Sequence, residues 1–115
     1  DPMMRSKIND GTTLYADYHL SESGMYVEEG FFGTMNVAIV EAVRITEDGA
    51  LVPSSSVGNN VEYLDAAEKI IIEVNSWQSE ELEGMHDIWT VPALPNRIPI
   101  PITKAGDRIG TLVST

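Results

Sequence analysis

The clearest hydrophobic pattern in the chain is the run "NVAIVEAVRI" at residues 36–45. Its start is almost uninterrupted by polar residues, which is typical of a strand buried on both faces of a sheet that helices cover. The pair Asp48-Gly49 follows, and such a pair accepts the positive φ angles of a tight hairpin turn. Leu51 and Val52 then return antiparallel. We therefore predict a β-hairpin from this part of the chain.

A helix followed by a strand is predicted directly after this hairpin. In "VEYLDAAE" at 61–68, apolar residues recur at spacings of three and four, as on one face of an amphipathic helix. The run "KIIIEV" at 69–74 is typical of a second buried strand.

Two further elements are predicted nearer the N-terminus. The stretch "TTLYADY" at 12–18 is rich in β-branched and aromatic residues, which favours a strand. Ser21 is a good helix N-cap, and Glu22 suits the positive end of the helix dipole. We therefore expect a helix from Ser21 to about Phe32, ended by Gly33.

The pattern weakens after residue 75. One helical turn is predicted at 79–83, stopped by Gly84. Prolines then exclude a regular helix or a central strand, because each lacks an amide donor; they are Pro92, Pro95, Pro99 and Pro101. Alternating isoleucines make this part too apolar for a free linker. We predict a core at 1–91 and an ordered Pro-rich C-terminal arm at 92–115.

Together these elements alternate between strand and helix, which predicts a single α/β domain with a largely parallel sheet, flanking helices and one β-hairpin. The 115 residues are enough for one hydrophobic core. Hydrophobic residues make up 43% and charged residues 22%, as in ordinary globular proteins.

The charge balance narrows the classes of partner. Seven Lys and Arg stand against eighteen Asp and Glu, a net charge of −11. Such a charge repels nucleic acid and anionic lipid, so we expect neither as a partner. The general interpretation of this acidity is a solvated surface that keeps the protein soluble.

Cysteine and segment composition add expectations about location. The chain has no cysteine, which excludes disulfides and thiolate metal sites and fits a reducing, cytoplasmic compartment. Its longest apolar runs are far shorter than the roughly 18 residues that a membrane span needs. The N-terminus shows neither a signal peptide nor an initiating Met, and we expect the chain to belong to a longer polypeptide.

One stretch without any charge is a candidate binding loop. "PSSSVGNN" at 53–60 lies just before the predicted helix at 61–68. Free amides at the helix start, the Gly58 backbone and the side chains of Asn59 and Asn60 would suit a phosphate or carboxylate. The alternative is simple capping by Asn60 with a turn at Gly58. No Walker lysine and no GxGxxG pattern is present.

Two histidines each have a carboxylate close in sequence, His19 with Asp17 and His86 with Asp87. A His-Asp pair suits an oriented general base, although a structural, hydrogen-bonded histidine is the commoner case. The two histidines lack the spacing of a ligand cluster, so no metal site is predicted.

Arg108 belongs to a local concentration of positive charge near the C-terminus, together with Lys104. Such a cation suits an anionic ligand or a salt bridge to an acidic neighbour.

Several ordered blocks go further than these patterns. The chain resembles the acetyl-CoA hydrolase/transferase family, which includes the succinyl-CoA:acetate and butyryl-CoA:acetate CoA-transferases. The blocks that carry the resemblance are "DPMMRSKIND" at 1–10, "AIVEAVRITEDGALVPSSSVGNN" at 38–60, "EKIIIEVNSWQ" at 68–78, "LEGMHDIW" at 82–89 and "PIPITKAGDRIG" at 99–110.

The resemblance implies an enzyme that moves coenzyme A between an acyl-CoA and a short carboxylic acid. Family members do so through a glutamyl-CoA thioester on a glutamate that lies outside this chain, so no catalytic residue is expected here. Coenzyme A would be a substrate, and no metal is implied. The alternatives are an acyl-CoA hydrolase and a non-catalytic binding or assembly module on the same scaffold.

The family protein is several times longer and has two related α/β domains. The resemblance therefore implies that this chain is an interior part of the first domain and that the arm leads to the second. It also implies that Gly58, Asn59 and Asn60 border the active-site cleft and that Arg108 contacts coenzyme A or the second domain. Apolar surface normally covered by the rest of the protein would favour a dimer or larger homo-oligomer.

Overall fold

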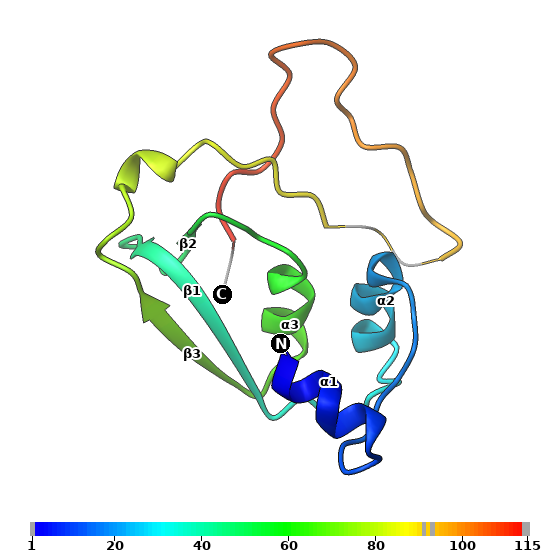
Figure 1. The fold of residues 1–115 in the computed structure, drawn as a ribbon. Coiled ribbons are helices and arrows are strands. Elements are labelled where there is room, and N and C mark those ends of the chain that lie inside the picture. Colours follow the sequence, from blue (N-terminus) through cyan, green and yellow to red (C-terminus); the bar gives the residue numbers. More distant parts are fainter. Residues whose placement is uncertain (1, 91, 93, 114–115) are drawn as a thin grey trace.

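The computed structural model describes residues 2–90, 92 and 94–113. In chain order its elements are the helix α1 (Pro2–Asn9), the 3-10 turn η1 (Leu20–Glu22), the helix α2 (Ser23–Glu28), the strands β1 (Val37–Ile45) and β2 (Leu51–Pro53), the helix α3 (Asn60–Ala66), the strand β3 (Lys69–Val74) and the 3-10 turn η2 (Glu80–Leu82) (Figure 1).

The strands form a three-stranded sheet in the order β2-β1-β3. β1 pairs antiparallel with β2 and parallel with β3, with Ile39 opposite Ile71 in the parallel pair. The α/β class, the hairpin and the strands predicted at 36–45 and 69–74 are therefore confirmed. The sheet is mixed, however, with one parallel and one antiparallel pair. A hairpin connects β1 to β2, which makes that pair antiparallel, and α3 connects β2 to β3, which brings β3 back parallel to β1.

The hairpin turn is longer than the predicted tight turn. The Thr46 N–H donates to the Ala50 carbonyl at 2.8 Å, which closes a loop of residues 46–50. Gly49 has a φ of 90°, whereas Asp48 has a negative φ, as do all other non-glycine residues in the described part of the chain. A two-residue type I′ turn would need positive φ at both positions.

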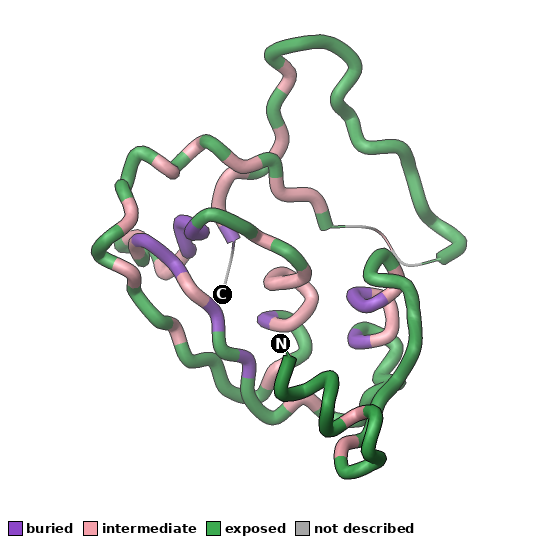
Figure 2. The backbone as a smooth tube through the Cα atoms, in the orientation of Figure 1, coloured by how far each residue is buried: buried purple, intermediate pink, exposed green. Residues whose placement is uncertain are grey.

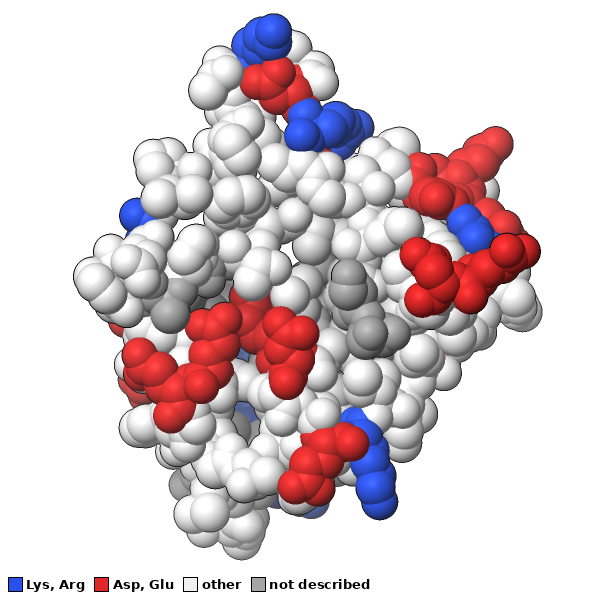
Figure 3. Space-filling view, turned by 180° about the vertical axis from the view of Figure 1, so that it is seen from behind, with Lys and Arg blue, Asp and Glu red and all other residues white. Residues whose placement is uncertain are grey.

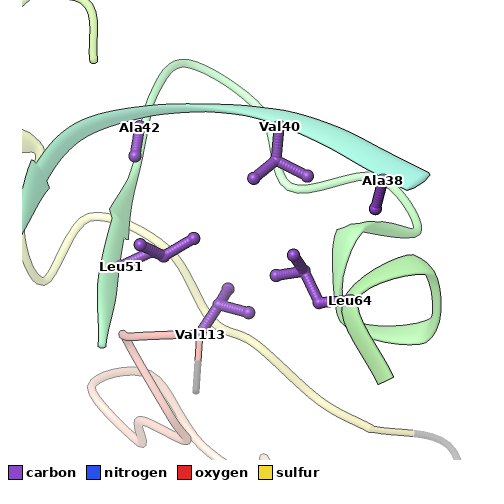
Figure 4. Packing of buried hydrophobic residues seen from close by; sticks show 6 residues of the cluster. All are labelled: Ala38, Val40, Ala42, Leu51, Leu64 and Val113. Carbon is purple, nitrogen blue, oxygen red and sulfur yellow. The ribbon is translucent and has the colours of Figure 1, made fainter. Parts of the chain in front are cut away.

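The hydrophobic core lies between the sheet and α3. Alternate β1 side chains meet Leu64 from α3 and Leu51 from β2, and Val113 completes the cluster (Figure 4). The β1 members are Ala38, Val40 and Ala42. α2 in turn packs on α3, so the two helices form successive layers on one side of the sheet.

The other side of the sheet is open at Val37, Ile39 and Ile71 in the described structure, so the prediction that β1 and β3 are buried on both faces along their length is wrong. Ile39 is 69% exposed and Ile71 is 53% exposed. They share a face because directly paired residues point the same way. We call Val37, Ile39 and Ile71 the open face. These strands carry apolar residues on both faces, but helices cover only one face, so the apolar residues of the other face are exposed.

The N-terminal part differs most from prediction. The predicted strand at 12–18 does not form: no regular element spans it, and no strand pairs with it among the described residues. A strand depends on a partner, and this segment has β propensity without one. Leu14 is fully exposed.

The predicted helix at 21–32 is shorter and begins differently. Ser21 lies inside η1 and does not cap it; α2 starts at Ser23, whose hydroxyl donates to the Leu20 carbonyl at 2.9 Å. α2 ends at Glu28 because Gly30, with φ of 70°, turns the chain into the left-handed region. Gly33 has the same hand but follows the end of the helix.

The described residues after position 90 contain no helix or strand. Residues 94–106 form an exposed excursion (Figure 2), and the chain then returns to the sheet. Leu51 and Val113 exchange two backbone hydrogen bonds of 2.8 and 3.0 Å, and Val113 is buried. The alternating isoleucines, from which we predicted an ordered arm and not a free linker, are exposed; they are Ile98, Ile100 and Ile102. That this segment leads to a second domain stays a prediction.

Two surface properties bear on function. No helix in the described part of the chain has the length and apolar character to cross a membrane. Acidic side chains lie in several separate groups on the face seen in Figure 3, where basic side chains are fewer.

Candidate functional site

The loop between β2 and α3 (residues 54–59, the β2–α3 loop) has two held ends and an open middle. Its first residue, Ser54, is 4% exposed. Ser55 and Ser56 are exposed and make no hydrogen bond within the described residues, whereas Val57 and Asn59 are partly buried. The loop is therefore anchored to the fold and offers its central backbone to solvent.

Ser54 is held on two sides. Its hydroxyl donates to Glu41 Oε2 at 2.9 Å, and its carbonyl lies 2.6 Å from His86 Nε2. Since a carbonyl only accepts, His86 carries its proton on Nε2 in this arrangement. Glu41 Oε1 accepts a second hydrogen bond from the Asn75 side-chain amide. These four residues form what we call the Glu41 network.

The hydrogen bonds of this network also favour the ionised form of Glu41. The donors Asn75 and then Ser54 hold the pKa of the Glu41 carboxyl below its ordinary value, because they stabilise the ionised form. The sequence analysis did not single out Glu41 as a site residue. The sequence did contain a signal for this network: a carboxylate lies within the strand at 36–45, and the polar residues Ser54 and Asn75 directly follow the two strands that flank it.

The far end of the loop is tied to α2. The Asn59 side-chain amide donates to Ser23 Oγ, and the Asn60 N–H donates to the Val57 carbonyl at 3.1 Å. The N-cap of α3 is Asn59, whose side chain makes no capping bond. Capping by the Asn60 side chain is thus wrong, whereas the turn at Gly58, with φ of 53°, is as expected.

Beside the loop is an open hollow of about 720 Å³. The wall combines apolar and neutral polar residues: Leu20, Ser21, Ser56, Val57, Gly58, Asn59, Asn60 and Tyr63. None of these described lining residues carries a positive charge. α3 is only seven residues long, so its dipole adds little attraction for an anion. The hollow therefore suits a neutral chain of mixed polarity better than a phosphate.

Arg108 lies elsewhere, in an ion pair. Its Nη1 donates to Asp87 Oδ2 at 3.0 Å, and the Ile109 N–H reaches the other carboxylate oxygen at 3.4 Å. This is the salt-bridge alternative. Arg108 does not line the hollow, so the structure brings Gly58, Asn59 and Asn60 together and leaves Arg108 apart from them.

Neither histidine forms a catalytic pair here. His86 bonds to Ser54, while Asp87 holds Arg108. His19 and Asp17 line a hollow of about 250 Å³, but the described structure contains no hydrogen bond between their side chains. Among the described residues no group of three or more His, Cys, Asp or Glu is placed to hold a metal ion.

Comparison with known proteins agrees with the resemblance. Residues 2–98 match the model of the acetyl-CoA hydrolase/transferase N-terminal domain. A succinyl-CoA:acetate CoA-transferase from Clostridium kluyveri is 48% identical over 112 residues, covering 97% of this chain and 21% of that protein.

Two further relatives carry different names. An acetyl-CoA hydrolase from Schizosaccharomyces pombe is 45% identical and covers 90% of this chain and 21% of its own length. A propanoyl-CoA:succinate CoA transferase from Escherichia coli is 39% identical, covering 94% of this chain and 22% of its own length. The chain thus spans about a fifth of the length of these curated relatives. It belongs to the acetyl-CoA hydrolase/transferase N-terminal domain family.

Proposed function

We propose that this chain is part of an enzyme that transfers coenzyme A between an acyl-CoA and a short carboxylic acid. The observation that carries the proposal is the 48% identity to a succinyl-CoA:acetate CoA-transferase over 97% of the chain. Coenzyme A is a substrate in this scheme, and the acids belong to the class of acetate, propanoate, succinate and butyrate.

The proposed chemistry is covalent catalysis by a glutamate outside this chain. That carboxylate attacks the acyl-CoA carbonyl, which gives an acyl-glutamyl anhydride and releases the CoA thiolate. The thiolate then attacks the glutamyl carbonyl, so the acid leaves and a glutamyl-CoA thioester remains; the acceptor acid reverses these steps. Splitting the exchange lowers each barrier.

Within this chain the β2–α3 loop is the proposed contact with acyl-CoA. Gly58 supplies exposed backbone, and the Asn60 side chain lines the hollow without a hydrogen-bond partner in the described structure. Asn59 lines the same hollow while its amide holds Ser23, so it shapes the wall as well. The mixed polarity of the hollow matches the amide-bearing pantetheine arm of coenzyme A better than its phosphates.

Arg108 is proposed as a second contact, with coenzyme A or with the second domain. Its side chain is half-exposed, and a surface ion pair such as the one with Asp87 is weak, so the guanidinium is available to exchange partners.

A second candidate is acyl-CoA hydrolysis, which the 45% identity to an acetyl-CoA hydrolase favours. Water then replaces the acceptor acid. A non-catalytic binding or assembly module is the third, and it predicts neither activity.

The deciding experiment uses the full-length protein that contains this chain. With acetyl-CoA and succinate, a transferase produces succinyl-CoA, and mass spectrometry of the protein detects a glutamyl-CoA adduct. Free thiol release without an acceptor acid identifies a hydrolase. Absence of both reactions, tested with several short acids, contradicts the enzymatic proposals and favours the module.

Asn60→Ala in the full-length enzyme is expected to raise the KM for acyl-CoA about 2- to 10-fold, the effect of losing one neutral hydrogen bond. Steady-state kinetics measures it, with thermal unfolding as a check on the fold. Arg108→Ala is expected to act in the same direction. Asn36→Ala is the matched control, because Asn36 is exposed and does not line the hollow; a wild-type KM in Asn60→Ala would remove that residue from the site.

A further inference from the structure

The Glu41 carboxylate bridges all three strands of the sheet. Glu41 is in the central strand β1, its Oε2 accepts from Ser54 directly after β2, and its Oε1 accepts from Asn75 directly after β3. The Asn75 N–H also donates to the Ala42 carbonyl at 2.8 Å, which extends the parallel ladder by one bond. Both oxygens therefore have donors from neighbouring strand ends.

Those contacts converge on the first residue of the β2–α3 loop. Ser54 is buried, its hydroxyl is held by Glu41, and its carbonyl is held by His86 from the segment after η2. A residue held through both its side chain and its backbone has little freedom to rotate. The direction in which the chain leaves β2 is thereby set by the Glu41 network.

The rest of the loop has few constraints of its own. Its middle makes no hydrogen bond through Ser55 or Ser56 in the described residues, and its far end is tied to α2 through Asn59. A loop held at two points and open between them takes its shape from those points. If Ser54 is released, one of the two anchors is lost.

We propose that Glu41 is a positioning residue which, by holding Ser54, preorganises the β2–α3 loop for acyl-CoA. The inference rests on the proposed function, since it takes that loop as the binding surface. Preorganisation strengthens binding because the ordering of the loop is completed before the ligand arrives. In this scheme Glu41 acts only through Ser54, whose hydroxyl donates to its Oε2.

The test uses the full-length enzyme with Glu41→Ala and Glu41→Gln. Loss of the charged acceptor in Glu41→Ala is expected to raise the KM for acyl-CoA about 10-fold, with a smaller change in kcat. Glu41→Gln keeps the side-chain size and one acceptor oxygen, so it preserves the fold and gives an intermediate rise. Glu73→Gln is the matched control: Glu73 pairs with Glu41 across β1 and β3 but is exposed and outside the network.

A double-mutant cycle with Asn60→Ala separates positioning from general destabilisation. If Glu41 acts through the loop, the double variant lowers kcat/KM relative to wild type by less than the product of the two single effects. Hydrogen exchange provides a readout that needs no activity. The Asn60 amide, which donates to the Val57 carbonyl within the loop, is expected to exchange faster in Glu41→Ala, while the amides of β1 and β3 stay protected.

The outcomes are distinguishable. Independent, multiplicative effects on kcat/KM, or unchanged exchange of the Asn60 amide, would overturn the positioning role. A wild-type enzyme that neither transfers nor hydrolyses acyl-CoA would overturn the proposed function, and the exchange measurement would still decide whether Glu41 orders the loop.

Discussion

At the residue scale, Glu41 shows how a carboxylate is accommodated in an otherwise apolar strand. Ionised carboxylates need donors when water is partly excluded, and Asn75 and Ser54 supply one for each oxygen. The same donors lower the pKa of Glu41. A lowered folded-state pKa contributes stability above the unfolded-state value near 4.5, and this contribution is lost as the pH falls through the folded-state pKa.

Asn75→Ala is therefore expected to raise the pKa of Glu41 toward its ordinary value, because Asn75 makes the larger contribution to the lowering. Ser54→Ala should raise the same pKa by less. A carboxyl-detected NMR titration between about pH 2 and 7 measures both. An unchanged Glu41 pKa in Asn75→Ala would show that this hydrogen bond does not hold in solution.

At the scale of elements, the contact of α3 with β1 organises the molecule. α3 is too short to be stable alone, so its helical form depends on burying Leu64 against Ala38 and Val40 of β1. Its position also sets where the β2–α3 loop ends, since the N-cap Asn59 reaches Ser23 of α2. The candidate site is thus positioned by one helix and one strand end.

Leu64→Ala is expected to lower the free energy of unfolding by about 2–5 kcal/mol, the cost of a cavity in a packed core. Leu64 is 5% exposed. Leu14→Ala makes the same chemical change at a fully exposed position and is expected to stay within about 0.5 kcal/mol of wild type. Chemical denaturation of both variants measures the difference; similar values would contradict the packing of α3 on β1.

At the scale of the whole molecule, the distribution of apolar surface is uneven. One side of the sheet is covered by α3 and α2, while the open face presents Val37, Ile39 and Ile71 to solvent. Contiguous apolar surface of this kind favours association, even in a chain with a net charge of −11. We propose self-association of the chain through this face.

Ile39→Ser combined with Ile71→Ser is expected to shift the chain toward monomer, because it removes apolar area from the open face. Multi-angle light scattering over a range of concentrations measures the mass. Ile98→Ser combined with Ile100→Ser is the control, since these isoleucines are also exposed but lie in the excursion after residue 90. A wild-type chain that stays monomeric at high concentration would contradict the proposal.

Local pattern was enough to predict β1, the hairpin, α3 and β3, because each has a periodicity or turn pair of its own. The β2–α3 loop was also recognisable from its uncharged, turn-forming composition. The family resemblance, confirmed by the match over residues 2–98, likewise depends on residue order alone. The strand expected at 12–18 failed because β propensity does not supply a partner strand.

What the sequence by itself determined is therefore the identity of the family and the elements whose stabilising contacts are near in the chain. Tertiary structure decided which face of the sheet is covered, that Val113 enters the core, and that Glu41, Ser54, Asn75 and His86 meet. The physical reason is that hydrogen bonds and burial depend on distance in space. The hydrogen-bonded pairs among these four residues are 13 to 34 positions apart in the sequence and become neighbours only when the sheet has formed.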